Sequence, residues 1–372
     1  MVSFNLPSTT ALEHKFISEA LSGRLCGDGP YTKKASVLFQ NVTGVEGMIL
    51  TTSCTHALEL AALLCDIRPG DEVILPSYTF SSTANAFLLR GAKLVFCDIC
   101  EDTLNMDENL LPDLITSKTK AIIPVHYAGI PCEMDAIIAL ADKHRLFVIE
   151  DAAQAVGSTY RNRPCGALGD IGCYSFHETK NYSMGEGGGI VIRDGVMRNR
   201  AEMIREKGTD RSSFLRGEVD KYTWREIGSS FLPSDILAAL LCAQLTRFDE
   251  IMQGRMKVWD AYHSALLPLE AKGWRRPAVP DGCTHNAHMY YLIAPGAGER
   301  TRFISALKKR GVQSVSHYEP LHASPMGTGM GYKPEDLPVT LDLAARLVRL
   351  PMWAGMGESQ ISVACEEAVK CS

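Results

Sequence analysis

One lysine stands where a nucleophilic amine could do chemistry. Lys180 lies in the segment SFHETKN, after a β-type run and before the glycine-rich stretch SMGEGGG. A lysine amine that is partly removed from water can attack an aldehyde cofactor and form an imine. Taken alone, Lys180 is more simply explained as a solvated surface lysine, since most lysines are exposed. A catalytic interpretation therefore needs partners elsewhere in the chain.

A carboxylate follows another apolar run. Asp151 ends the segment LFVIED, and a carboxylate at the end of a buried strand is costly unless it faces a cation. A protonated pyridine nitrogen is such a cation, and holding that proton keeps the ring of pyridoxal phosphate (PLP) an electron sink. The alternative is that Asp151 caps the next helix. Gln154, about one helical turn further on, could hydrogen-bond the phenolic oxygen of the same cofactor.

Other segments could complete a cofactor site. TTSCTHALEL puts hydroxyl residues before a helix, where Ser53 or Thr55 would be a natural N-cap. The free amides at such a helix start also bind phosphate, although plain capping is the simpler explanation. In PSYTFSSTANA, Tyr78 or Phe80 could lie against a pyridine ring or pack in the core. His126, in PVHYAG, could be a polar site residue or a satisfied loop histidine.

Each of these signals is weak alone, but their order along the chain is informative. A helix start, an aromatic residue, an aspartate and a lysine follow one another. Together they supply a phosphate site, a ring face, a partner for the ring nitrogen and an amine for the aldehyde. The set predicts a PLP enzyme in which Lys180 and Asp151 are catalytic.

The elements that must position these residues alternate between helix and strand patterns. Strands are predicted at residues 71–75, 92–98, 121–125, 146–149, 171–176 and 188–192, and helices at 55–64, 81–89, 133–144 and 234–248. This alternation is typical of an α/β protein with a mostly parallel sheet between helices. Polar segments follow the strands, at the sheet edge where ligands bind. The regular alternation of helix and strand patterns changes near residue 245. A large domain over 1–245 and a smaller α/β domain over 246–372 are therefore predicted.

The bulk composition excludes several classes of function. The 372 residues carry a formal net charge of -5, which gives no basic face for nucleic acid. The 12 cysteines form no Cys-x-x-Cys pair, so no metal site or dithiol centre is expected, and reduced thiols in a cytoplasmic protein are predicted. The N-terminus lacks a signal-peptide pattern, and no apolar run approaches a membrane span.

Together the motifs resemble the DegT-type sugar-nucleotide aminotransferases, a family of fold-type I PLP enzymes. The similarity covers nearly the whole chain. It is carried by SCTHALEL, GDEVILPSYTFSSTANA, PVHYAG, VIEDAAQAVGS, GCYSFHETKN, GEGGGIV and REKGTDR, with SGRLCGDGPYT near the start and HYEPLH near the end. The resemblance implies a seven-stranded, mostly parallel sheet and a homodimer whose active sites are shared between subunits.

The resemblance also implies roles for individual residues. Lys180 corresponds to the Schiff-base lysine and proton shuttle, Asp151 to the partner of the ring nitrogen, and Gln154 to the neighbour of the ring hydroxyl. Phe80 corresponds to the aromatic residue that stacks on the ring. The implied phosphate-binding positions are Cys54, Thr55, Ser175 and, from the neighbouring subunit, Ser230. The resemblance places His317 and His322 near the sugar nucleotide, and His126 and Glu178 are further candidates for substrate binding.

Three positions depart from the family pattern. Cys54 replaces the usual glycine, but its backbone amide can still bind phosphate. Ser230 stands where many members have asparagine, and its shorter side chain reaches less far toward phosphate. Glu178 replaces a commoner proline or neutral residue. It could either raise the pKa of Lys180 or contact a substrate hydroxyl.

The resemblance is strongest to members that make dTDP-4-amino-4,6-dideoxygalactose for surface polysaccharides, through FHETKN, RGEVDKYTWREIGSSFLPSDI and DGCTHNAHMYY. It implies transfer of the amino group of L-glutamate to dTDP-4-keto-6-deoxyglucose. A 3-keto sugar, or a sugar linked to GDP or UDP, stays open as the acceptor. A sugar dehydratase is disfavoured because such members have histidine in place of Lys180. A PLP-binding regulator is disfavoured because no DNA-binding pattern occurs.

Overall fold

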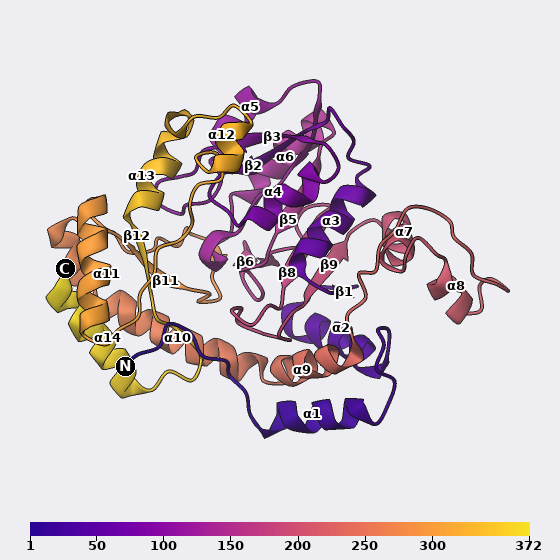
Figure 1. The fold of residues 1–372 in the computed structure, drawn as a ribbon, viewed down its shortest axis with the longest axis horizontal. Helices are drawn as coiled ribbons and strands as arrows, with labels where there is room; N and C mark the ends of the chain where they lie inside the picture. The colour runs from indigo at the N-terminus through magenta and orange to yellow at the C-terminus, as the bar shows by residue number, and fades with distance from the viewer.

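The central element of the fold is a seven-stranded mixed sheet. The computed structural model describes residues 1–372, and its main sheet has the strand order β1-β9-β8-β5-β4-β2-β3 (Figure 1). The strands are β1 (Ile49–Thr51), β2 (Glu72–Pro76), β3 (Lys93–Cys97), β4 (Thr119–Ile122), β5 (Phe147–Asp151), β8 (Ile171–Ser175) and β9 (Gly188–Ile192). Only β9 runs antiparallel to its neighbours. The predicted mostly parallel seven-stranded sheet is therefore confirmed.

Helices cover both faces of this sheet. The helices up to the middle of the chain are α1 (Ala11–Leu21), α2 (Pro30–Thr43), α3 (Cys54–Leu64), α4 (Ser81–Leu88), α5 (Leu111–Leu114), α6 (Met134–His144), α7 (Gly195–Arg205), α8 (Arg211–Leu215) and α9 (Asp235–Thr246). Val73 and Leu75 of β2 pack in one core cluster with α3, α4 and α7. The intervening Ile74 packs on the opposite face with α6. Buried side chains of α1, α2 and α9 fill that same face beside β8 and β9.

The C-terminal part of the chain has its own core around a two-stranded antiparallel sheet. It contains α10 (Phe248–Ala265), β11 (Tyr290–Ile293), α11 (Ala297–Lys309), α12 (Pro325–Gly329), α13 (Pro338–Arg346), β12 (Leu347–Leu350) and α14 (Glu358–Cys371). Val2 joins this part by bridging to Val312, so the first residues lie near the C-terminus (Figure 1). The domain boundary after residue 245 falls within α9 and stays a prediction.

The remaining elements are short. They are the 3-10 turns η1 (Glu108–Leu110), η2 (Tyr127–Gly129), η3 (Leu267–Lys272) and η4 (Pro334–Asp336), and the small sheet of β6 (Thr159–Tyr160), β7 (Arg163–Pro164) and β10 (Cys283–Thr284). The sequence did not predict this sheet, because two-residue strands have no alternation to detect. No helix in the structure has the length and apolar character that crossing a membrane requires.

Two strand ends differ from the sequence prediction in ways that affect the site. β4 ends at Ile122 rather than Val125, because Pro124 has no backbone N–H to continue the ladder. β5 continues through Asp151 instead of ending at residue 149. Asp151 is therefore held by strand hydrogen bonds, with its N–H donating to the Pro124 carbonyl at 2.9 Å.

The glycine-rich stretch brings β9 against the start of α3. A Cβ atom at Gly188 would lie 2.4 Å from the Cys54 backbone nitrogen and 2.5 Å from the Ser53 carbonyl oxygen. No side chain fits between the two backbones at that separation. Glycine at this position therefore allows β9 to support the N-terminal turn of α3, which the sequence predicted as a phosphate site.

We expect Gly188→Ala to destabilise the protein by about 1–3 kcal/mol, because the added methyl group must displace backbone atoms. Gly195→Ala is the matched control, since nothing lies within 4 Å of a Cβ atom there. That change should leave stability unchanged or slightly raised, as alanine favours the helix more than glycine. Chemical denaturation of both variants measures the difference. Equal midpoints would contradict the packing argument.

Candidate active site

A cavity of about 370 Å³ lies between the carboxyl ends of β5 and β8, the start of α3, and β12. The structure brings most of the sequence-predicted site residues together in its wall: Cys54, Thr55, Phe80, Asp151, Gln154, Ser175, Lys180 and His317. Four others do not line this cavity: His126, Glu178, Ser230 and His322. The fold therefore brings distant residues to this cavity, since Cys54 and His317 are 263 positions apart in the sequence.

The amine of Lys180 has no partner within the chain. Its backbone N–H donates to the His177 carbonyl at 2.9 Å, which fixes the turn after β8. Its Nζ makes no hydrogen bond or ion pair with another residue. Burial lowers the pKa of Lys180 from its usual range, and the opposing negative charges are weaker than this effect. A larger fraction of the amine is therefore neutral, which is the nucleophilic form.

Asp151 is held rigidly at the other side of the cavity. Thr83 Oγ1 donates to Asp151 Oδ2 at 2.7 Å, and the Ala153 amide donates to Oδ1 at 3.1 Å. The Thr83 hydroxyl is itself 2.8 Å from the Thr79 hydroxyl. These bonds satisfy part of the carboxylate and fix its orientation, while its remaining acceptor capacity faces the cavity. The alternative that Asp151 caps a helix does not apply, because no helix begins after β5.

The start of α3 offers unpaired backbone donors to the cavity. Ser53 is the N-cap, and its hydroxyl accepts from the His56 amide at 3.0 Å. The first-turn amides of Cys54 and Thr55 have no acceptor in the chain. Thr55 Oγ1 lies 2.7 Å from Ser82 Oγ. Burial raises the pKa of the Cys54 thiol well above its usual range, so this side chain adds no negative charge to an anion site.

Gln154 and Phe80 are placed by separate contacts. Gln154 Oε1 accepts from the Ala128 amide at 2.7 Å, which turns Nε2 toward the Tyr318 hydroxyl at 3.3 Å. Phe80 is the N-cap of α4 and 59% exposed, with its ring centroid 6.1 Å from that of Tyr318. An exposed aromatic ring at a cavity mouth can cover the face of a planar ligand.

His126 is a structural residue of this fold rather than a cavity residue, which corrects its prediction as a substrate ligand. Its ring is fully buried, and Nε2 lies 2.9 Å from Glu150 Oε2. The Cys132 amide donates to its Nδ1 at 3.1 Å, so the proton is on Nε2. Glu150 also accepts the amides of Gly166, Leu168 and Gly169, each at 2.7 Å. Consecutive strand residues point to opposite faces, so Asp151 faces the cavity and Glu150 points away from it.

The two late histidines have different surroundings. Both ring nitrogens of His322 are used, Nδ1 with Ser77 Oγ at 2.6 Å and Nε2 with the Pro334 carbonyl at 3.0 Å. His322 is fully buried and does not line the cavity, because these bonds turn its ring toward η4. His317 does line it, and its Nδ1 lies 3.0 Å from the Tyr127 hydroxyl. Burial lowers the pKa of His317 to about 2, so its ring is neutral.

Glu178 and Ser230 also lie outside the cavity. Glu178 is exposed and lines a separate, smaller hollow beside residues 5–9, with which the main cavity shares Lys180. Lys180 lines this hollow too, but the Glu178 carboxylate forms no ion pair with it. Ser230 is exposed in the segment before α9 and does not line the cavity of its own chain.

The sequence reasoning missed a polar network behind Lys180. Asn181 Nδ2 donates to the Asn286 carbonyl at 2.7 Å, and Asn181 Oδ1 lies 2.9 Å from His288 Nδ1. His288 therefore carries its proton on Nδ1 and presents Nε2 as an acceptor. Burial lowers its pKa well below the usual range, so the ring is neutral. Asn286 and His288 belong to the motif DGCTHNAHMYY, but nothing in the sequence shows that this motif packs next to Lys180.

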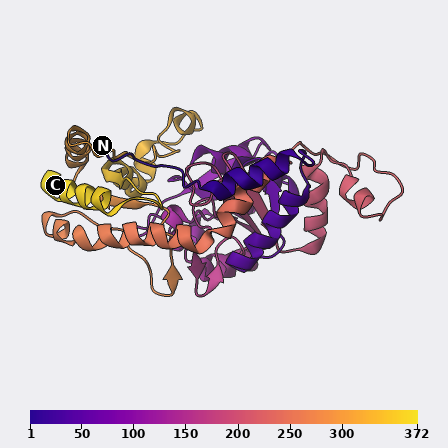
Figure 2. The same cartoon turned by 90° about the horizontal axis from the view of Figure 1, so that it is seen from below.

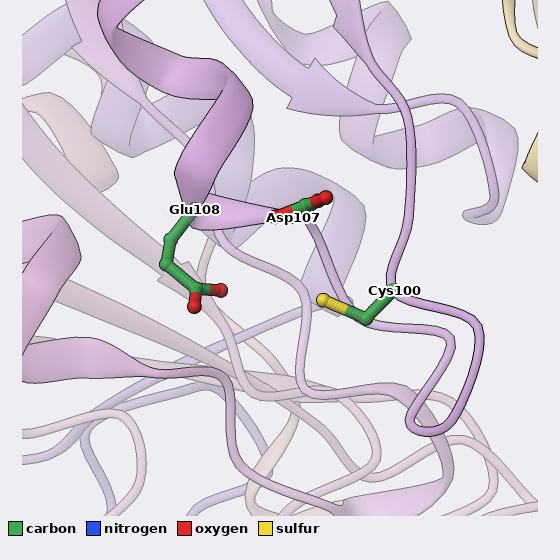
Figure 3. A group of neighbouring side chains, drawn as sticks. All are labelled: Cys100, Asp107 and Glu108. Carbon is green, nitrogen blue, oxygen red and sulfur yellow. The ribbon is translucent and has the colours of Figure 1, made fainter.

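One group of side chains has the spacing of metal ligands, and it lies away from the cavity. Cys100, Asp107 and Glu108 are half-buried between β3 and η1, with their ligand atoms within 4.8 Å of one another (Figure 3). Acidic groups of this kind are common without an ion, and no other feature indicates a ligand there. We therefore assign no metal site.

Comparisons with known proteins agree with this geometry. The model of the "DegT/DnrJ/EryC1/StrS aminotransferase family" matches residues 7–368. The spore coat polysaccharide biosynthesis protein SpsC of Bacillus subtilis is 34% identical, over 96% of this chain and 94% of its own length. GDP-perosamine synthase of Caulobacter vibrioides is 32% identical, over 97% and 95%.

Solved structures share the whole fold. The aminotransferase TlmJ from Streptoalloteichus hindustanus superposes with a TM-score of 0.91 at 29% identity, covering 99% of this chain and 98% of its own. The Streptococcus pneumoniae protein Spr1654 in its PLP form gives 0.91 at 26% identity, covering 100% and 99%. The fold-type I architecture predicted from the sequence is confirmed by these likenesses.

Replacing His126 separates a structural role from a substrate role. We expect His126→Leu to reduce the free energy of unfolding by about 1–3 kcal/mol, because the buried Glu150 carboxylate loses a donor. The Michaelis constant for the acceptor substrate should not change, since the ring lies outside the cavity. Thermal unfolding and steady-state kinetics of the same preparation measure both. A raised Michaelis constant with unchanged stability would restore His126 as a substrate ligand.

Proposed function

This chain belongs to the DegT/DnrJ/EryC1/StrS aminotransferase family and is a PLP-dependent enzyme, and we propose that it transfers the amino group of L-glutamate to dTDP-4-keto-6-deoxy-D-glucose. The products would be 2-oxoglutarate and dTDP-4-amino-4,6-dideoxy-D-galactose. The observation that carries the proposed chemistry is the unpaired, desolvated amine of Lys180 in the same cavity as the fixed carboxylate of Asp151.

The residues present fit PLP. The orphan amides of Cys54 and Thr55 would hold its phosphate, because the helix start is a ready anion site. Asp151 would accept a hydrogen bond from the protonated ring nitrogen, and Phe80 would cover the ring. When bound, PLP supplies an aldehyde for an amine and a ring that withdraws electrons from the reacting carbon.

Lys180 would perform the proton transfers. In its resting role the amine holds the cofactor, and once a substrate amine replaces it, its Nζ is free. Its lowered pKa suits it to take a proton from the Cα atom of the amino donor and to return one to the cofactor carbon. The acceptor sugar would then undergo the same transfers in reverse order. Thr83 and the Ala153 amide would keep the Asp151 carboxylate in a fixed orientation during these transfers.

The choice of a nucleotide-linked 4-keto sugar is supported by the relatives and by the sequence motifs. GDP-perosamine synthase is named for an amino sugar on a nucleotide, and SpsC for polysaccharide biosynthesis. The first of these also keeps a GDP-linked acceptor as the second candidate. We propose that the product serves surface-polysaccharide assembly and that the enzyme acts in the cytoplasm.

A projecting arm supports the proposed homodimer. The segment 206–230, which contains α8, extends away from the body of the chain in both views (Figures 1 and 2). It carries exposed apolar side chains, with Trp224 78% and Ile227 63% exposed. Such side chains on an extended arm mark a protein contact. Ser230, at the base of this arm beside Glu206, would then reach the phosphate site of the second copy. A monomer in sedimentation equilibrium would contradict this arrangement.

A panel of acceptors tests the proposed substrate. We expect the enzyme, with L-glutamate, to convert dTDP-4-keto-6-deoxy-D-glucose far faster than the matching UDP- or GDP-linked sugars. Mass spectrometry of the product and the visible absorbance of the cofactor report each reaction. Lys180→Ala should abolish turnover with every acceptor, because no other residue in the cavity offers an amine. Preference for the GDP-linked sugar would overturn the choice of nucleotide and leave the aminotransferase assignment intact.

A further inference from the structure

One arginine in the cavity wall has neither a counter-ion nor a side-chain hydrogen-bond acceptor. Arg349, on β12, lines the cavity together with Lys180 and Asp151. Its guanidinium makes no side-chain hydrogen bond and no ion pair, and its Nε atom is buried without a partner. The ring of Phe4 lies 5.0 Å from the guanidinium carbon and covers one face of the group. The guanidinium is therefore held in place while its edge stays unsatisfied.

Two fully buried arginines show which acceptors a guanidinium has elsewhere in this protein. Arg205 is 5% exposed and pairs with Asp28 at 2.7 Å, and it also donates to a backbone carbonyl. Arg255 is 4% exposed and donates to the carbonyls of Ala287 and His288 at 2.9 and 2.6 Å. Arg349 alone of the three has neither kind of acceptor. Arg349 is half-buried in the cavity wall, where a charge without an acceptor is costly, so its retention indicates an anionic ligand.

The surroundings of Arg349 supply no anion. The groups that act on its charge are the hydroxyls of Tyr78, Tyr127 and Tyr318, whose pKa values are all raised by burial, that of Tyr127 to about 12. They are neutral at ordinary pH. Burial lowers the pKa of Arg349 itself, but a guanidinium stays charged in proteins. The compensating anion must therefore come from a bound molecule.

We propose that Arg349 binds the α-carboxylate of the amino donor, an inference that rests on the proposed function in taking the donor to be an amino acid. The α-carboxylate lies one bond from the carbon that Lys180 deprotonates, so its binding group must stand near Lys180. Arg349 does so, since its charge contributes to lowering the pKa of Lys180. A guanidinium edge also matches a carboxylate with two parallel hydrogen bonds.

A phosphate of the acceptor nucleotide is a less suitable ligand. The orphan amides for a cofactor phosphate are on α3, in the central-sheet part, whereas Arg349 stands on the C-terminal two-stranded sheet (Figure 1). Arg255 also lines the cavity, but its guanidinium already donates to two backbone carbonyls. Arg349 therefore offers the one guanidinium fork of the cavity that has no acceptor, which suits one carboxylate better than a diphosphate. Arg349 should therefore be required in the donor half of the reaction and dispensable in the acceptor half.

The two half-reactions test this separately on the PLP-loaded enzyme. In Arg349→Met, we expect the second-order rate with L-glutamate to fall about 10- to 100-fold, as for loss of a charge-assisted bidentate bond. The amine-loaded enzyme should react with the keto sugar at close to the wild-type rate. Arg349→Lys keeps the charge but loses the fork, so it should be impaired in the donor half alone. Arg302→Met, on the exposed face of α11, removes a charge remote from the cavity and should match wild type in both.

Binding of glutarate gives a readout that needs no turnover. This dicarboxylate has no amine, and its calorimetric affinity for the loaded enzyme should fall in both Arg349 variants and not in Arg302→Met. Unchanged glutarate affinity, or a defect confined to the sugar half-reaction, would overturn the inference. If wild type reacts with neither L-glutamate nor the keto sugar but glutarate binding still depends on Arg349, the proposed function fails and the carboxylate site stands.

Discussion

The site depends on one costly arrangement, a lysine amine withdrawn from water without a carboxylate to pair it. Lys180 lies in the wall of the cavity with its pKa lowered by burial. A salt bridge to Asp151 would remove this cost, but it would also raise the pKa of the amine and occupy the carboxylate. The fold prevents it by tying Asp151 to Thr83 and to the Ala153 amide. Each group is thus left available for a bound cofactor.

The pleat of β5 separates this arrangement from a second buried charge. Glu150 and Asp151 are consecutive and point to opposite faces of the strand. Glu150 is fully compensated by three backbone amides and His126. Asp151 receives fewer donors and faces the cavity. The two neighbouring carboxylates therefore differ in role. Glu150 holds the loop after the small sheet against the core, and Asp151 is free to bind a cation.

Local sequence patterns predicted the features that depend on neighbouring residues alone. The sequence located β9 at residues 188–192, the N-cap Ser53 and the polar strand ends that hold Asp151 and Lys180. It could not show how distant segments pack. His126 follows an apolar run as site residues do, and His322 lies in the motif HYEPLH, but the rings of both turn into the core. Arg349 sits in the apolar run RLVRLPMW, and only the assembled C-terminal sheet shows that its guanidinium enters the cavity.

The most direct test of the account is to locate the covalent bond between cofactor and protein. The enzyme is loaded with PLP, reduced with borohydride, digested and mapped by mass spectrometry. The account predicts a single pyridoxyl-phosphate adduct, on Lys180, with none on the exposed lysines. An adduct at another lysine, or no adduct in an enzyme that still transaminates, would contradict the assignment of Lys180 on which the site is built.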